Sequence, residues 1–134
     1  MIDRRCQWQL SLALCALYAG PIAASTSETA AAMIAEFADQ APRELSAEAG
    51  RNLWFKSWQE ERSCTSCHSN STTTNGSHVR TNKLIKPIAP SANPERLTDR
   101  KKINKWLLRN CKWTLGRECS AQEKGDVLLW LSSQ

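Results

Sequence analysis

Two cysteines and a histidine near the middle of this 134-residue chain have the spacing that attaches haem covalently. Cys64-Thr65-Ser66-Cys67-His68 reads C-x-x-C-H, the attachment signature of c-type haem. Two thiols separated by two residues on a helical turn add across the two vinyl groups of one porphyrin, and the spacing is strict because the porphyrin is rigid. His68 then offers a neutral imidazole nitrogen to the iron. The motif predicts one haem c per chain, held by Cys64 and Cys67, with His68 as the proximal iron ligand.

Two other chemistries use the same residue types. Cys64, Cys67, His68 and His78 could form a Cys2His2 zinc site, but adjacent ligands such as Cys67 and His68 are awkward for one tetrahedral ion. The second histidine pair of a zinc finger is also missing. A thioredoxin-like redox pair would need a strand-helix-strand pattern around the cysteines, and none surrounds them. Haem attachment is therefore favoured, provided that the chain is exported.

The sixth iron ligand is not obvious from the sequence. Electron-carrying domains of this kind mostly use a methionine after the haem motif, but the two methionines, Met1 and Met33, both precede it. His78 is the second of two histidines and lies in a polar segment, either as an axial ligand or as a solvated side chain. The distal side is thus empty or filled by a weak or unusual donor. This favours ligand binding over simple electron transfer.

Residues 1–24 have the pattern of a Sec-type signal peptide. Two arginines near the start precede an apolar run over residues 8–19, a Gly-Pro pair breaks the run, and small residues follow. The run is too short for a comfortable membrane span, although an uncleaved N-terminal anchor is the alternative. We expect cleavage after Ala24 and a periplasmic location for residues 25–134.

The remaining 110 residues are enough for one small domain. A domain of this size buries little apolar surface by itself, and a porphyrin would supply part of its core. The whole chain has a formal net charge of +5, or about +4 once the signal peptide is removed. This modest excess suits a weakly acidic protein partner better than nucleic acid, which usually meets a clustered basic patch. We expect no nucleic acid partner.

The cysteine count leaves one even pair. Of six cysteines, two lie in the signal peptide and two in the haem motif, so that Cys111 and Cys119 remain. In an oxidising compartment a disulfide between them is the economical interpretation. Its short loop would contribute roughly 2–3 kcal/mol to stability.

The elements that must position these residues are predicted to be helices. Ser25 and Glu28 have the spacing of a capping box before an alanine-rich helix over residues 29–40. A second helix is expected from near Ser46 toward Gln59.

Two further helices are expected in the second half of the chain. Thr98 is expected to cap a helix with apolar residues at i, i+3 and i+4 from Ile103. Ser120 and Glu123 form a capping box that opens the last helix.

The segments between these helices lack periodicity. Residues 69–82 are rich in Ser, Thr and Asn and predict a surface loop, and residues 83–94 contain three prolines and predict a stiff extended segment. No strand and no second domain are indicated. Gly50 allows a close helix crossing that Trp54 fills one turn later. The order predicts an all-α, class I cytochrome c fold with about four helices around one haem.

Several stretches together resemble the sphaeroides haem protein family, whose members are oxygen-binding monohaem cytochromes c. The more specific part of the resemblance is the tail, Ile103-Asn104-Lys105-Trp106-Leu107-Leu108-Arg109-Asn110-Cys111, followed by Gly116-Arg117-Glu118-Cys119 and Glu123-Lys124. The remaining matches are Ser63 to His68, Ile88-Ala89-Pro90-Ser91-Ala92 and Arg96-Leu97-Thr98-Asp99. The resemblance covers most of residues 25–134, more weakly before Gly50.

The resemblance assigns the distal iron ligand to Asn110, directly before the first cysteine of a Cys111–Cys119 bridge. It implies that the asparagine holds ferric iron and leaves on reduction, so that the ferrous site binds O2, NO or CO. An amide oxygen is a hard, neutral donor that suits ferric iron better than the softer ferrous ion. His78 departs from what the family pattern leads us to expect in the loop.

We therefore expect a monomeric, exported monohaem cytochrome c that binds a diatomic gas and exchanges electrons with other cytochromes. The resemblance implies a dihaem cytochrome c, supplied by a membrane cytochrome b, as partner. A basic rim could dock it, formed by Lys83, Lys86, Lys101, Lys102, Lys105 and Arg109. The alternatives are a plain electron carrier with fixed six-coordinate iron, and a haem enzyme that processes NO or peroxide. The enzyme has less support, because no general acid–base pair is visible.

Overall fold

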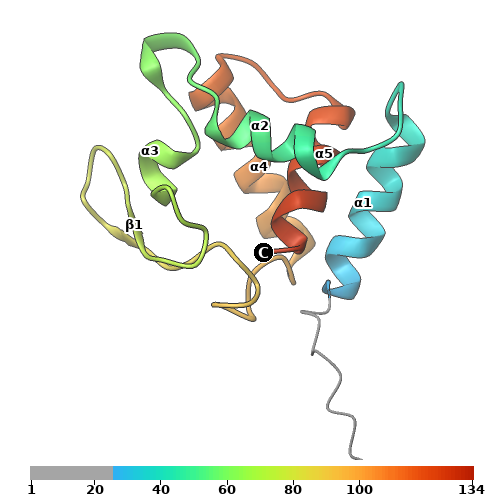
Figure 1. Cartoon of the computed structure of the whole chain (residues 1–134), viewed down its shortest axis with the longest axis horizontal. Helices are drawn as coiled ribbons and strands as arrows, with labels where there is room; N and C mark the ends of the chain where they lie inside the picture. The colour runs from blue at the N-terminus through green and yellow to red at the C-terminus, as the bar shows by residue number, and fades with distance from the viewer. Residues whose placement is uncertain (1–25) are drawn as a thin grey trace, which may run out of the picture.

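A computed structural model describes residues 26–134, and the predicted signal peptide lies outside these residues. The described chain is mostly helical (Figure 1). Its elements, in order, are α1 (Glu28–Gln40), α2 (Ala47–Phe55), the 3-10 turn η1 (Gln59–Glu61), α3 (Thr65–His68), β1 (Gly76–Ser77), β2 (Leu84–Ile85), α4 (Arg100–Leu115) and α5 (Ala121–Ser132). None of the helices formed by these residues has the length and apolar character needed to cross a membrane.

The hydrophobic core lies where α5 packs against both α1 and α2. Two apolar clusters fill it, Ala30, Met33, Ile103 and Leu128 in one, and Trp54, Val127, Trp130 and Leu131 in the other. The terminal helix thus packs back on the first helix, as the fold class predicts. The all-α expectation is confirmed, and α4 contacts α1 and adds Ile103 to the first cluster.

The crossing of α2 and α5 depends on a glycine. A Cβ atom at Gly50 would lie 2.0 Å from the carbonyl oxygen of Asp126, which no side chain tolerates. One turn later Trp54 is buried, and its ring lies 5.5 Å from that of Trp130. The predicted roles of Gly50 and Trp54 are both confirmed.

A buried carboxylate joins the start of α2 to α5. Asp126, 3% exposed, accepts hydrogen bonds from the Ser46 backbone N–H at 2.7 Å and from the Gln122 side-chain amide at 2.9 Å. Both donors satisfy a charge that would otherwise be costly to bury. Arg43 adds a longer contact to the same carboxylate, at 3.5 Å through Nη2.

The predicted helix starts are partly wrong. α1 is capped by Ser27, whose hydroxyl accepts from the Ala30 backbone N–H at 3.1 Å, and not by a box built on Ser25, which lies outside the described residues. The cap of α4 is Asp99 rather than Thr98. The Ser120–Glu123 capping box of α5 is confirmed, because both of its reciprocal hydrogen bonds are present.

The second helix is shorter than predicted. α2 ends at Phe55, and the chain then makes the 3-10 turn Gln59–Glu61, in which Glu60 and Glu61 have positive φ angles of 53° and 56°. Because the helix ends at Phe55, Trp58 can pack against the cluster around Cys111 and Cys119. This tertiary contact has no signal in the local sequence.

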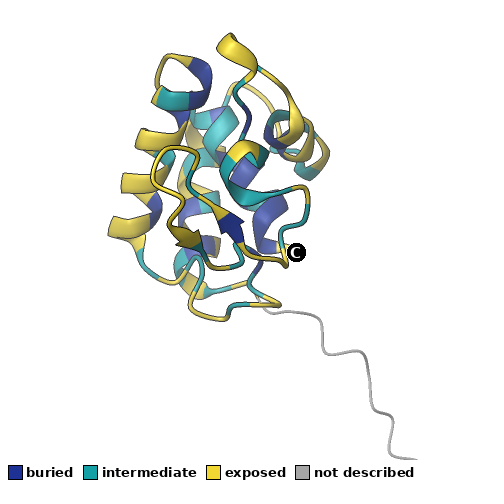
Figure 2. Cartoon of the chain, turned by 90° about the vertical axis from the view of Figure 1, so that its left-hand side faces the viewer, coloured by how far each residue is buried: buried dark blue, intermediate teal, exposed yellow. Residues whose placement is uncertain are grey.

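Residues 69–99 form the irregular side of the molecule (Figure 2). Contrary to the expectation of no strand, Gly76 pairs with Ile85 and Ser77 with Leu84 in a short antiparallel ladder. Two residues per strand are too few to show an alternating pattern. Seen from this side, the segment is mainly exposed or partly buried, whereas buried residues gather on the helices behind it (Figure 2).

Candidate haem site

A cavity of about 830 Å3 opens between the irregular side and α4. This volume is within the range of cofactor sites. Its lining includes Cys64, Cys67 and His68 from the haem motif and Asn110 from α4. The structure therefore brings together the four residues that the sequence assigns to haem.

The haem motif is a single helical turn. α3 spans Thr65–His68, and the His68 backbone N–H donates to the Cys64 carbonyl at 3.1 Å. Residues at i, i+3 and i+4 share one side of a helix, so Cys64, Cys67 and His68 present their side chains together to the cavity. Neither cysteine takes part in a disulfide.

The loop after the motif returns close to this turn. A Cβ atom at Gly76 would lie 2.0 Å from the Cys67 carbonyl oxygen, so β1 approaches the turn as only glycine allows. Farther along, the Thr72 carbonyl accepts from the backbone N–H groups of Ile88 and Ala89 at 3.0 and 2.9 Å. The segment is thereby folded into a wall of the cavity.

The electrostatics of the motif favour a neutral imidazole. Burial, together with the positive charge of Arg96, lowers the pKa of His68 to about 4. A neutral imidazole keeps a lone pair for a metal. Burial also raises the pKa of the Cys64 thiol to about 12, which is the opposite of the depressed pKa of a reactive redox thiol.

Arg96 is held firmly beside the cavity. Its guanidinium donates to the Pro87 carbonyl at 2.8 Å through Nε and to the Lys86 carbonyl at 2.7 Å through Nη2. These bonds fix a positive charge on the cavity lining and brace the proline-rich segment against it.

The cavity lining fits a large, mainly apolar group with acidic edges. Three large apolar side chains on the lining are unusually exposed, namely Leu84 at 68%, Trp106 at 47% and Val79 at 43%. Such a cluster normally marks a binding surface, and a porphyrin would cover it. Basic residues such as Lys83 and Arg96 also line the cavity and suit the porphyrin's carboxylates. The residues present fit haem.

Asn110 shares a second, smaller cavity with the motif. About 30 Å3 is enclosed between the motif and three residues of α4, and its lining is Ser63, Cys64, Cys67, His68, Asn110, Trp113 and Thr114. Asn110 and His68 therefore line the same small cavity.

The other candidate donors are placed differently. His78 lines the large cavity but not the small one, and its Nδ1 accepts from the Arg80 backbone N–H at 3.3 Å within the hairpin. Met33 is buried, 1% exposed, in the core cluster of α1. Within residues 26–134, His, Cys, Asp and Glu side chains form no cluster of three or more that could hold a metal ion by themselves.

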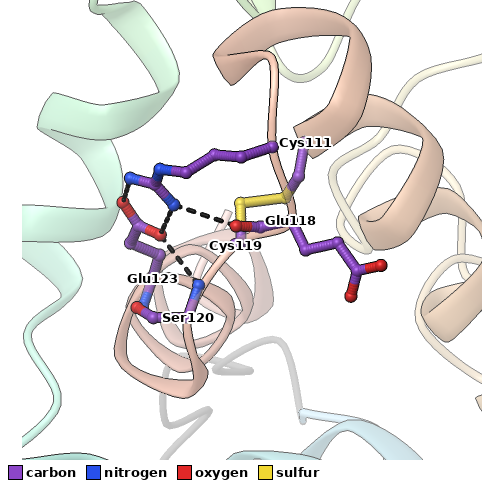
Figure 3. Close-up of a disulfide and its surroundings, with 6 residues drawn as sticks. Cys111, Glu118, Cys119, Ser120 and Glu123 are labelled. Atoms are coloured by element: carbon purple, nitrogen blue, oxygen red, sulfur yellow. Dashed lines mark hydrogen bonds and ion pairs between the residues drawn. A yellow bond between two sulfur atoms is a disulfide. The ribbon is translucent and has the colours of Figure 1, made fainter.

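The predicted disulfide is confirmed. Cys111 and Cys119 are bonded, with their Cα atoms 5.5 Å apart, and close the connection between α4 and α5 (Figure 3). Within this connection Gly116 takes a left-handed φ of 74°, which ends α4. Since Cys111 directly follows Asn110, the bridge fixes the end of the helix that carries Asn110.

An ion pair beside the bridge was not predicted. The Arg117 guanidinium makes two hydrogen bonds of 2.8 Å to the Glu123 carboxylate, which also accepts from the Ser120 backbone N–H at 2.8 Å (Figure 3). These bonds, led by those from Arg117, lower the pKa of Glu123. The Arg of the G-R-x-C block therefore secures the start of α5.

Sequence reasoning also missed two cavity residues on α4. Trp113 and Thr114 line the small cavity with Asn110, and their positions at i+3 and i+4 could have indicated this. Arg62 holds Trp113 from outside, donating to its carbonyl at 3.3 Å and lying 5.2 Å from the centre of its ring.

Comparison with known proteins agrees with this geometry. A family model described as a domain of unknown function (DUF1924) matches residues 40–131. The cytochrome c-type protein SHP of Cereibacter sphaeroides is 41% identical over 127 residues, which are 92% of this chain and 97% of that protein. This chain belongs to the sphaeroides haem protein family.

Solved structures show the fold of the family. Oxidised SHP, an oxygen-binding cytochrome c, matches 82% of this chain and all of its own with a TM-score of 0.75 at 39% identity. Oxidised cytochrome c'' from Methylophilus methylotrophus matches 77% of this chain and 92% of its own with a TM-score of 0.68 at 26% identity. The class I monohaem fold and one haem c per chain are therefore established for this family member.

Proposed function

We propose that this protein is a gas-binding c-type cytochrome whose distal ligand depends on the iron oxidation state. Cys64 and Cys67 hold the haem through thioethers, His68 is the proximal ligand, and Asn110 is the distal ligand in the ferric state. When bound, the haem supplies an iron that changes oxidation state and accepts a sixth ligand. The observation that carries the proposal is the small cavity shared by His68 and Asn110, which neither His78 nor Met33 lines.

The choice of an amide explains why the distal position opens. The Asn110 side chain is neutral and hard, so it binds ferric iron better than the softer ferrous ion. Asn110 is exposed toward the open cavity rather than packed in the core, so its side chain has room to leave. Its release on reduction frees a position for O2, NO or CO. The name of the matched SHP structure, an oxygen-binding cytochrome c, supports this assignment.

Electron exchange is proposed to occur across the basic face of α4. Lys101, Lys105 and Arg109 recur every four residues, are exposed, and form no ion pair within residues 26–134. Trp106 lies among them, with its ring centre 5.4 Å from Lys105 Nζ and 5.7 Å from Arg109 Cζ. Trp106 also lines the large cavity. This face would steer an acidic redox partner toward the cavity. The family resemblance suggests a dihaem cytochrome c that receives electrons from a membrane cytochrome b.

The remainder of the predicted basic rim is less uniform. Lys83 and Lys86 come from the irregular side and are exposed, whereas Lys102 is paired with Asp99 at 3.8 Å. We propose that the docking face therefore centres on α4. We further propose that residues 1–24 direct export, that residues 25–134 are the mature domain, and that the protein acts as a periplasmic monomer.

The decisive experiment compares optical spectra of the holoprotein and two variants. In the wild type, the ferric spectrum should be six-coordinate, and the ferrous spectrum should be high-spin and shift when CO is added. Asn110→Ala should bind azide or cyanide faster in the ferric state, because no internal ligand must leave. His78→Ala is the matched control, and neither its ferric nor its ferrous spectrum should differ from that of the wild type.

Two results would contradict the proposal. A low-spin ferrous spectrum that ignores CO would identify a plain electron carrier with fixed ligands. A ferric spectrum that changes in His78→Ala but not in Asn110→Ala would identify a bis-histidine cytochrome instead.

A further inference from the structure

The small cavity contains a hydroxyl that the fold does not use. Thr114 is only 2% exposed, lines both cavities, and its hydroxyl makes no hydrogen bond to another residue of the described chain. A threonine inside a helix commonly turns its hydroxyl to solvent or to the carbonyl four residues earlier. Thr114 makes no such bond to the Asn110 carbonyl, and its oxygen is not among the buried side-chain atoms that lack a partner in the described chain, so the hydroxyl opens into the cavity that Thr114 lines.

The position of Thr114 relates it to the distal ligand. Asn110, Trp113 and Thr114 occupy i, i+3 and i+4 of α4 and therefore share one side of the helix. Across the cavity lie the motif residues Cys64, Cys67 and His68. Thr114 is thus one helical turn from Asn110 on the same wall.

The other hydroxyl of this cavity is already engaged. Ser63 Oγ lies 2.6 Å from Thr65 Oγ1 and 3.3 Å from Ser66 Oγ, and these contacts organise the motif turn. Thr114 consequently supplies the unengaged hydroxyl of the small cavity.

We propose that Thr114 is a specificity-determining residue of the gas site, and that its hydroxyl donates a hydrogen bond to the diatomic ligand after Asn110 has left. The inference rests on the proposed function and deepens it. Hydrogen-bond donors on the distal side decide which ligands a haem protein retains. Dioxygen gains acceptor character when it binds to ferrous haem, whereas CO remains a weak acceptor, so Thr114 favours O2 over CO.

The test compares holoproteins carrying Thr114→Val and Thr114→Ser. Valine has nearly the same shape but no hydroxyl, and it leaves no protein partner unsatisfied. In Thr114→Val the ferrous affinity for O2 should fall about three- to tenfold, the effect of one hydrogen bond. The affinity for CO should stay nearly constant, and the C–O stretching frequency of the ferrous CO complex should rise.

Two controls separate the hydroxyl from packing. Thr114→Ser keeps the hydroxyl and should retain most of the O2 preference and the wild-type C–O stretching frequency, even if removal of the methyl group lowers stability. Thr81→Val removes a hydroxyl from the rim of the large cavity, outside the small one, and should leave both measurements unchanged.

The outcomes distinguish this inference from the proposed function. If wild-type ferrous protein binds no CO, the proposed gas site itself is wrong. If the wild type binds both gases, while Thr114→Val keeps the same O2-to-CO affinity ratio and C–O frequency, Thr114 has no such role and the gas site stands. Equal losses for both gases at an unchanged C–O frequency would also overturn the inference, because they indicate altered packing.

Discussion

The helical core and the cavity wall are stabilised by different interactions. The helical core, formed by α1, α2 and α5, buries two contiguous apolar clusters and contains the close crossing at Gly50. In the cavity wall, residues 63–98, just three residues are buried, namely Ser63, Gly76 and Ala89. The wall is held instead by short hydrogen bonds among hydroxyls and carbonyls, and its large apolar side chains face the cavity. The helices have an apolar core of their own, although Trp54, Val127 and Leu128 of that core also line the cavity. The wall has no such core, and the haem would take its place.

Preventing haem attachment should produce the largest difference in stability between the helical core and the cavity wall. In a Cys64→Ala, Cys67→Ala double variant produced without haem, amides of the cavity wall should lose most of their protection from hydrogen exchange. Amides of α1, α2 and α5 should keep more protection, because these helices also pack directly against one another. Native-state hydrogen exchange read by mass spectrometry measures both regions in one sample. Equal loss of protection in both would show that the chain is a single cooperative unit around the haem.

Replacing each of two glycines by alanine tests whether the helical core is more rigid than the cavity wall. An added Cβ would meet a backbone oxygen at 2.0 Å both at Gly50 in the core and at Gly76 in the wall. Gly50→Ala must push two packed helices apart, and we expect a loss of roughly 3 kcal/mol in the free energy of unfolding. Gly76→Ala can be accommodated by movement of an exposed loop, and we expect about 1 kcal/mol.

Urea unfolding of the two holoproteins, followed by far-ultraviolet circular dichroism, gives both free energies. Gly76→Ala should also shift the haem absorption bands, because its neighbour is the carbonyl of Cys67, whereas Gly50→Ala should not. A larger loss of stability in Gly76→Ala would refute the ranking of the two regions.

The smallest expected effect concerns the start of α5, at the edge of the helical core. Because the pKa of Glu123 is lowered in the folded protein, its stabilisation is complete above the unfolded value of about 4.3. The stabilisation is lost as the pH falls through the lower folded value. Since this ion pair is partly solvated, its contribution should be below about 1 kcal/mol. Glu123→Gln keeps a capping-box side chain but should flatten the decline in stability below pH 5.

Urea unfolding midpoints between pH 7 and pH 3 measure this slope. Glu118→Gln is the matched control, because its carboxylate pairs with Lys112 at 3.2 Å and does not cap the helix. Identical pH slopes for wild type and Glu123→Gln would mean that the Arg117 pair adds nothing to stability.

Local sequence patterns predicted the presence of the helices better than the residues at which the helices begin and end. The Ser120–Glu123 box is right because both partners are close in sequence and no equivalent residue competes nearby. At α1 the choice among Ser25, Thr26 and Ser27 is made by a distant residue, since the Ser27 hydroxyl also donates to the Leu97 carbonyl. The cap of α4 likewise falls on Asp99, whose carboxylate accepts from the Lys102 backbone N–H at 3.0 Å, while Thr98 bonds to Glu95.

The residues of the candidate haem site also divide into those that the local sequence predicts and those that it does not. The haem motif specifies its own geometry, because a single turn places Cys64, Cys67 and His68 on one side. Asn110 required the family resemblance, since nothing local distinguishes it from a helix-end asparagine. Thr114 required the structure, because the rotation of α4 decides which of its residues face the cavity.

The bridge between Cys111 and Cys119 has a consequence for how the protein is made. Residues 25–134 contain two cysteine pairs with opposite chemical fates, one joined as a disulfide and the other assigned to haem attachment. An oxidant able to close the first pair can also join Cys64 to Cys67, which would consume the thiols that react with the porphyrin. Formation of the protein would therefore require Cys64 and Cys67 to stay reduced until the haem is attached, while Cys111 and Cys119 are oxidised in the same chain.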